Sequence, residues 1–121
     1  MAKSVLAVDD SKTMRDMVSF TLRGAGYTVV EADNGVTALK ALQGQKVDVI
    51  ITDVNMPEMD GITLVRKIRA QPQYAGTPIL ILTTESDQSK KDEGRGAGAT
   101  GWIVKPFSPE KLLQIVAKVC P

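Results

Sequence analysis

The sequence predicts an α/β fold, a doubly wound, five-stranded parallel sheet with five helices. Two observations lead to this prediction. Short apolar runs with the length of buried strands alternate with longer segments whose apolar residues recur at helical spacing. The alternation continues along the chain without a repeat or a linker, and with right-handed crossovers it places helices on both faces of one sheet.

The predicted strands are the apolar runs 5–8, 27–32, 47–52, 78–82 and 101–104. Four of these runs end at a polar residue or pair, namely Asp9 with Asp10, Asp53, Thr83 and Lys105. All strands of a parallel sheet point the same way, so their C-terminal ends share one edge. We therefore expect these side chains to converge on one crevice, where open α/β sheets bind ligands.

The predicted helices carry start and stop signals. The first follows Ser11 and ends at the glycines of 24–26, and the second opens at Asp33-Asn34-Gly35. Asp60 caps the third, which Pro72 ends, and the last begins with Ser108 at the cap and Pro109 at its first position. The expected core positions of these four helices are, in order, Met14, Met17, Val18, Leu22 and Ala25; Val36, Leu39 and Leu42; Ile62, Val65 and Ile68; and Leu112, Leu113, Val116 and Val119 or Cys120.

The fourth helix, between Ser86 and Gly101, is the exception because it contains Gly94, Gly96 and Gly98. Each glycine inside a helix costs roughly 1 kcal/mol relative to alanine, so we expect this helix to be short or loosely held. In one interpretation Gly96 or Gly98 simply ends it. In the other, a marginal helix beside Thr83 is easily repositioned, as a switch element must be.

The polar residues at the strand ends suit phosphoryl transfer. Crowded carboxylates favour a hard divalent cation, and Mg²⁺ fits best because it takes one or two carboxylates and leaves positions for water and phosphate. Lys105 offers a point charge to the same anion and Thr83 a hydroxyl donor. Asp53 follows the strand expected to be central, so it is the candidate nucleophile, and its attack on phosphorus would give an aspartyl phosphate.

Each of these residues also has a structural explanation when it is taken singly. The Asp9 and Asp10 pair resembles turn or capping chemistry, Asp53 a loop carboxylate, Thr83 a cap, and Lys105 a solvated surface charge. Turn chemistry does not, however, predict one specific residue type at four successive strand ends. Their joint occurrence favours a functional site.

Four segments carry a family resemblance. AVDDS at 7–11, TDVNMPEMDG at 52–61, LTTE at 82–85 and GWIVKPF at 101–107 resemble, in order, the signature blocks of two-component response-regulator receiver domains, and among them the stand-alone chemotaxis type. The resemblance covers essentially the whole chain. It implies a flavodoxin/CheY-like fold with strand order 2-1-3-4-5, in a single receiver domain over residues 1–121.

The resemblance also implies the roles of the site residues. Asp53 is the expected phosphoacceptor; Asp10, Asp53 and the backbone carbonyl of Asn55 are expected to hold Mg²⁺, with Asp9 acting mainly through water. Lys105 is expected to bind the phosphoryl group and Thr83 to move toward it. Asn55 and Glu85 occupy the positions expected to tune dephosphorylation, with self-hydrolysis over seconds to minutes.

Trp102 departs from the family pattern, which usually has tyrosine or phenylalanine three residues before the lysine. In the family this ring swings inward behind the activated threonine. An indole is larger and donates through Nε1, so two hypotheses stand: Trp102 switches with Thr83, or it is a fixed, half-buried packing residue.

The chain contains no histidine, so its phosphodonor, expected to be a histidine kinase, must act in trans. The resemblance places the output surface on helix 4, strand 5 and helix 5, where Lys90, Lys91, Arg95, Lys111 and Lys118 lie beside Trp102. The expected partner is an output protein such as a flagellar motor switch component, with a phosphatase as a further candidate. A phosphate sink or a phosphorelay intermediate would show the same features.

Two other classes of protein share part of the pattern. An aspartate-nucleophile phosphatase of the haloacid dehalogenase type carries its nucleophile after strand 1 in an Asp-x-Asp pattern, which Asp9-Asp10-Ser11 does not supply. A flavodoxin-like electron carrier needs hydroxyls and amides around an anion at that loop, where two aspartates would repel it.

Length and composition agree with one small domain. The 121 residues are 43% hydrophobic and 24% charged, enough for one core. The net charge of +1 gives no electrostatic reason to expect nucleic acid or an anionic membrane as a partner. The single Cys120 and the lack of an apolar leader at the start predict a cytoplasmic protein, which we expect to be a monomer and a signalling switch, not an enzyme.

Overall fold

The computed structural model describes residues 3–54, 56, 58–83, 88–105 and 107–120. Five strands form one parallel sheet in the order β2-β1-β3-β4-β5, as predicted. They are β1 (Ser4–Val8), β2 (Thr28–Ala32), β3 (Val49–Asp53), β4 (Ile79–Thr83) and β5 (Gly101–Val104).

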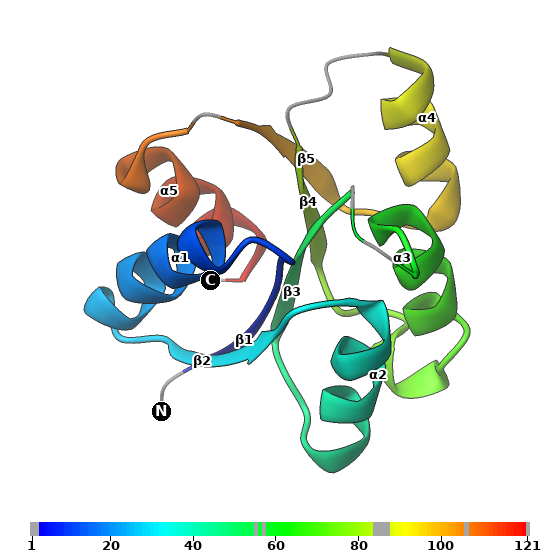
Figure 1. Ribbon diagram of the computed structural model, residues 1–121, viewed down its shortest axis with the longest axis horizontal. Helices are drawn as coiled ribbons and strands as arrows, with labels where there is room; N and C mark the ends of the chain where they lie inside the picture. The colour runs from blue at the N-terminus through cyan, green and yellow to red at the C-terminus, as the bar shows by residue number, and fades with distance from the viewer. Residues whose placement is uncertain (1–2, 55, 57, 84–87, 106, 121) are drawn as a thin grey trace.

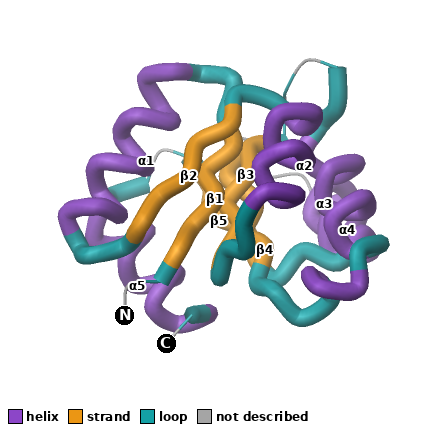
Figure 2. Tube along the Cα trace, turned by 90° about the horizontal axis from the view of Figure 1, so that it is seen from below, coloured by secondary structure: helices purple, strands orange, loops and turns teal. Residues whose placement is uncertain are grey.

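The helices are α1 (Lys12–Gly24), α2 (Gly35–Gly44), α3 (Gly61–Arg69), α4 (Gln88–Ala97) and α5 (Pro109–Val119), with a 3₁₀ turn η1 (Pro72–Tyr74) after α3. Helices α1 and α5 cover one face of the sheet, and α2, α3 and α4 cover the other (Figures 1 and 2). This arrangement confirms the doubly wound α/β fold. None of these helices is long and apolar enough to cross a membrane, within the described ranges.

The predicted caps of α3 and α5 are present, and side chains cap α1 and α2 in the same way. The side chains of Ser11, Asn34, Asp60 and Ser108 each accept a hydrogen bond from a backbone N–H in the first turn of α1, α2, α3 and α5, respectively. These bonds satisfy amides that a helix start would otherwise leave unpaired. They also set where each helix leaves the sheet, and therefore the shape of the loops above its C-terminal edge.

The strands β1, β3 and β4 form the centre of the core, and every residue of β3 and β4 is buried. The expected core positions of α3 are buried, as are Leu112 and Val116 of α5. The prediction for α2 was wrong at Val36, which is 38% exposed, whereas Ala38 is fully buried. Because α2 begins at Gly35, its inner face follows Gly35, Ala38 and Leu42. Ala25 is also exposed, since it lies at the cap after α1.

The glycines of α4 have separate roles. Gly98 has a φ of +110° and ends the helix: its N–H donates to the Arg95 carbonyl and that of Ala99 donates to the Gly94 carbonyl, both at 3.0 Å. This pair of bonds is a Schellman motif, which favours glycine at the left-handed position. The interpretation that Gly98 terminates the helix is therefore confirmed. Gly96 faces open space, and Gly94 packs against Trp102.

A guanidinium ties the ends of α3, α4 and β4 together at the edge of the sheet away from the carboxyl ends. Arg69 Nη1 donates to the carbonyls of Tyr74 (2.7 Å) and Thr77 (2.6 Å), and its Nε donates to the Gly98 carbonyl at 2.9 Å. Carbonyl groups of three segments thus share one charged donor. Such charge-assisted bonds are stronger than neutral ones, so this edge is firmly held.

Candidate functional site

The polar residues predicted to converge lie together at the carboxyl edge of the sheet. Asp53 and Thr83 are the last residues of β3 and β4, while Asp9 and Lys105 follow the last residues of β1 and β5. The sheet ladder extends to the site, because Asp9 N–H donates to the Ala32 carbonyl (3.1 Å) and Lys105 N–H to the Thr83 carbonyl (2.8 Å). Backbone pairing therefore positions these residues.

Asp9, Asp10 and Asp53 form an acidic cluster in which one carboxylate oxygen from each lies within 4.8 Å of the others. Asp9 and Asp53 are buried, with 3% and 8% of their surfaces exposed, and Asp10 is exposed. Buried and solvated carboxylates thus meet at one point. Oxygen donors at this spacing suit a hard divalent cation that keeps some of its water, as Mg²⁺ does.

Lys105 lies between the two buried carboxylates. Its Nζ is 3.4 Å from Asp9 Oδ2 and 3.4 Å from Asp53 Oδ1, and its side chain is 12% exposed. One ammonium does not balance three carboxylates, so the cluster keeps a net negative charge that a divalent cation would neutralise. Lys105 is also placed to contact an anion bound at Asp53.

Burial raises the pKa of the Asp53 carboxyl, and the neighbouring Asp9 carboxylate raises it further. Lys105 opposes this shift, as does the Val54 N–H, which donates to Asp53 Oδ1 at 2.8 Å. The charged form of Asp53 is thus disfavoured on balance in the protein without metal. A folded pKa above the unfolded one means that the native state binds protons more readily, so stability decreases as pH rises through the folded pKa.

This shift predicts that Asp53→Asn stabilises the metal-free protein near neutral pH. The amide keeps the acceptor for Val54 and Lys105 but removes the buried charge, so we expect the midpoint of thermal unfolding at pH 7 to increase by a few degrees. The gain should shrink as pH falls through the folded pKa, where wild-type Asp53 becomes protonated. Asp16→Asn, on the exposed face of α1, is the matched control and should change little. A lower midpoint for D53N at pH 7 would contradict the prediction.

Thr83 is fully buried at the end of β4, one position beyond the residue that pairs with Asp53 in the β3–β4 register. The structure therefore brings Asp9, Asp10, Asp53, Thr83 and Lys105 to one edge, as the sequence predicted. Asn55 and Glu85, predicted to contribute a metal-ligating carbonyl and to tune dephosphorylation, lie outside the described residues.

The indole of Trp102 is half-buried on the face of the sheet that α4 covers. A methyl group at Gly94 would lie 2.7 Å from Trp102 Cζ2 and 3.1 Å from Ile81 Cδ1, so glycine at this position makes room for the ring. Among the described residues, Trp102 Nε1 is buried without a hydrogen-bond partner. Trp102, the aromatic residue predicted to take part in signalling, is therefore well packed, but its indole N–H lacks a hydrogen-bond acceptor in the described part of the chain.

Two residues beside the site were missed by the sequence analysis. Arg15 of α1 donates to the Asp9 carbonyl, and Glu31 of β2 pairs with Arg15. The only signal in the sequence is a charged residue in the otherwise apolar second strand, which does not reveal its partner.

Comparisons with known proteins agree on one family. The family model for the response regulator receiver domain matches residues 5–117 of this sequence. The chemotaxis protein CheY homolog of Campylobacter jejuni is 44% identical over 110 residues, which are 89% of this chain and 85% of that protein. The chemotaxis protein CheY of Pseudomonas aeruginosa is 40% identical over 116 residues, 95% of this chain and 94% of its own.

Solved structures give the same result. The Vibrio cholerae chemotaxis protein CheY4 matches with a TM-score of 0.96 and 54% identity, over 98% of this chain and 99% of that one. The receiver domain of a sensor histidine kinase from Pseudomonas aeruginosa matches with a TM-score of 0.91 and 28% identity, over 99% and 98%. The latter structure has a magnesium ion coordinated in its active site cleft.

Proposed function

Because this chain belongs to the response regulator receiver domain family, we propose that it accepts a phosphoryl group on Asp53 and passes the signal to a separate protein. The observation that carries the proposal is the position of Asp53 at the end of β3, within 3.4 Å of the Lys105 ammonium and beside the Asp9 and Asp10 carboxylates. A nucleophile, a phosphate-binding cation and a cation site therefore adjoin one another.

The residues divide the work of phosphoryl transfer. The Asp53 carboxylate forms a bond to phosphorus as the bond from phosphorus to the donor breaks, and the departing group keeps that electron pair. Val54 N–H and Lys105 contact the same oxygen, Oδ1, and so orient the carboxylate. Lys105 then neutralises charge on the transferred phosphoryl oxygens.

Mg²⁺ fits the acidic cluster, with Asp9, Asp10 and Asp53 as the residues that would hold it and the Asn55 carbonyl as a further predicted ligand. When bound, the ion would neutralise negative charge on the phosphoryl group and on the carboxylates. Burial, with a smaller contribution from the Asp9 carboxylate, raises the pKa of Asp53, and a bound cation would offset both by stabilising its charged form.

The output surface proposed for this chain comprises α4, β5 and α5. Exposed cationic side chains on it include Arg95 of α4 and Lys111 and Lys118 of α5, and the half-buried Trp102 of β5 packs against Gly94 of α4. We propose a histidine kinase as donor and a flagellar motor switch component as partner in chemotaxis, in the cytoplasm. The relatives named chemotaxis proteins support this choice over a phosphate sink or a relay intermediate.

The test is phosphorylation with acetyl phosphate, followed by intact mass measurement. The wild type should gain one phosphoryl group in the presence of Mg²⁺ and none after chelation. Asp53→Asn should abolish the gain, while Asp16→Asn, also an aspartate on the described surface, should leave it unchanged. A labile phosphate on D53N, or an unmodified wild type under conditions where Mg²⁺ binding is confirmed, would overturn the proposal.

A further inference from the structure

Arg15 connects α1 to the backbone of the acidic cluster. Its Nη1 donates to the Asp9 carbonyl at 2.7 Å, a short bond for a charged donor, and its side chain is only 16% exposed. Its Nε donates to Glu31 Oε1 at 3.2 Å, so the planar guanidinium is held at two points. A group fixed in this way can fix what it touches.

The carbonyl that Arg15 binds belongs to the peptide that joins Asp9 to Asp10. The other polar groups of Asp9 are also engaged: its N–H with the Ala32 carbonyl at 3.1 Å, Oδ1 with the Ser11 N–H at 2.9 Å, and Oδ2 with Lys105 at 3.4 Å. Asp10 is exposed, so packing does not hold its side chain. The plane of the Asp9–Asp10 peptide therefore sets the direction in which the Asp10 side chain leaves the backbone toward the cluster.

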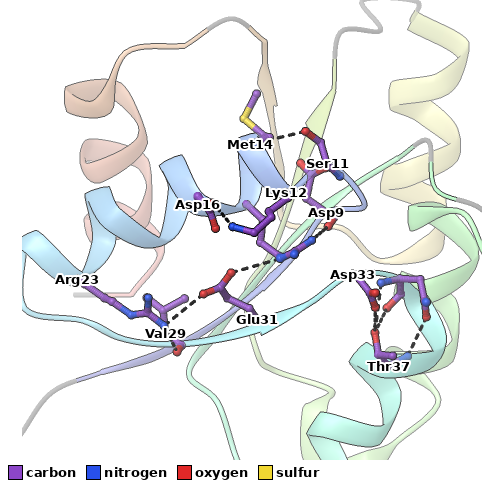
Figure 3. Close-up of polar contacts among 12 residues, drawn as sticks. Asp9, Ser11, Lys12, Met14, Asp16, Arg23, Val29, Glu31, Asp33 and Thr37 are labelled. Carbon is purple, nitrogen blue, oxygen red and sulfur yellow. Dashed lines mark hydrogen bonds and ion pairs between the residues drawn. The ribbon is translucent and has the colours of Figure 1, made fainter.

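Glu31 is shared between two arginines. Its Oε1 pairs with Arg15 and its Oε2 lies 3.4 Å from Arg23 Nη2, which also donates to the Val29 carbonyl at 3.1 Å. Both arginines thus bind the same carboxylate on β2, but of these contacts only the one from Arg15 continues to Asp9. Figure 3 labels Arg23, Val29, Glu31 and Asp9 in this region. Arg23 is therefore a matched control for Arg15, because it shares the Glu31 contact while the contact to the Asp9 carbonyl comes from Arg15.

We propose that Arg15 is a positioning residue for the cation site. By fixing the Asp9–Asp10 peptide it holds Asp10 where a divalent cation can bind it, and Glu31 orients the guanidinium for this purpose. The inference rests on the proposed function, since it takes the acidic cluster to be the Mg²⁺ site.

Charge and positioning predict opposite effects at this residue. A guanidinium near the cluster repels Mg²⁺, so removing its charge would strengthen Mg²⁺ binding if Coulomb interactions alone mattered. Loss of a residue that orients a ligand weakens metal binding, typically by 10- to 100-fold. The sign of the change therefore distinguishes the two roles.

The experiment compares Arg15→Met with Arg23→Met by calorimetric titration of the full chain with Mg²⁺, alongside thermal unfolding without Mg²⁺. Both variants lose one positive charge and one Glu31 contact. We expect R15M to bind Mg²⁺ about tenfold more weakly and R23M to stay within about twofold of wild type. Phosphorylation of R15M should need more Mg²⁺ for half-maximal rate but recover near saturation. If R15M does not fold, Arg15→Gln, which keeps a polar head, is measured against the same criteria.

Equal or stronger Mg²⁺ binding by the Arg15 variant would overturn the inference, as would an equal weakening in R23M. An impaired rate at saturating Mg²⁺ with unchanged affinity would also overturn it. Failure of the wild type to bind Mg²⁺ is a different result, because it would refute the proposed cation site itself.

Discussion

Gly61→Ala is expected to destabilise the protein by about 3 kcal/mol or more, because the added methyl group has no space. The Cβ would overlap the Asp53 carbonyl oxygen and lie 3.0 Å from Val54 Cα. These are backbone atoms at the end of β3 and cannot rotate away. Gly61 N–H also donates to the Val54 carbonyl at 2.8 Å, so α3 begins directly against the strand that carries the nucleophile.

Gly35→Ala is the matched control, since Gly35 is likewise the first residue of a helix that follows a capping side chain. A methyl group there meets the side chain of Met59, with Sδ at 2.6 Å, and methionine can change rotamer. We expect a smaller loss of unfolding free energy for G35A in urea denaturation. In G61A the end of β3 must shift, so phosphorylation should also slow under conditions where the protein stays folded. Equal stability of G61A and wild type would contradict the packing argument.

The second large effect is expected for Gly94→Ala, which should displace the indole of Trp102. The methyl group would lie 2.7 Å from Cζ2 and 3.2 Å from Cε2 of that ring. The buried Nε1 already lacks a partner among the described residues, a defect that costs about 1–3 kcal/mol, so turning the ring toward solvent is less costly than moving α4. Because Trp102 is the only tryptophan, emission should shift to longer wavelength.

Gly96→Ala separates this contact from helix propensity. Gly96 lies in the same helix and a methyl there meets no atom within 4 Å, so G96A should stabilise the protein by about 0.5–1 kcal/mol without changing the emission. G94A should lose that gain to the clash with the indole.

In wild type, beryllofluoride with Mg²⁺ should itself change the emission if Trp102 follows Thr83, and this response should be smaller in G94A and in Thr83→Ala. An unchanged emission in G94A would show that the helix yields instead of the ring.

The sequence predicted the site because each of its members comes directly after one of the apolar runs predicted to be strands. Asp53, Thr83 and Lys105 are found from strand ends alone, since parallel strands bring their carboxyl ends to one edge whatever the rest of the chain does. Helix caps were equally local, because a capping side chain bonds an amide three residues away. Local rules of this kind do not need the tertiary structure.

Contacts between distant segments were not predictable in the same way. Val36 fits a helical apolar pattern, but its exposure depends on where α2 begins and how it lies on the sheet. From the sequence, Gly94 was expected to weaken the helix, whereas in the fold it makes room for the indole of Trp102 on β5. From the sequence alone Arg15 looks like a charged surface residue, because its pairing with Glu31 depends on how β2 lies against α1. Each of these depends on the packing of one element against another.

The Arg69 contacts determine how α4 can move. Arg69 holds the carbonyl of Gly98, directly after α4, together with those of Tyr74 and Thr77, so any tilt of α4 that keeps these bonds pivots about its C-terminal end. The helix has 10 residues and is about 15 Å long. It then acts as a lever, and a tilt of about 10° sweeps its first turn through roughly 3 Å while its last turn stays in place. A partner that responds to such motion must therefore contact the N-terminal half of α4, which begins at Gln88 and follows β4 in the chain.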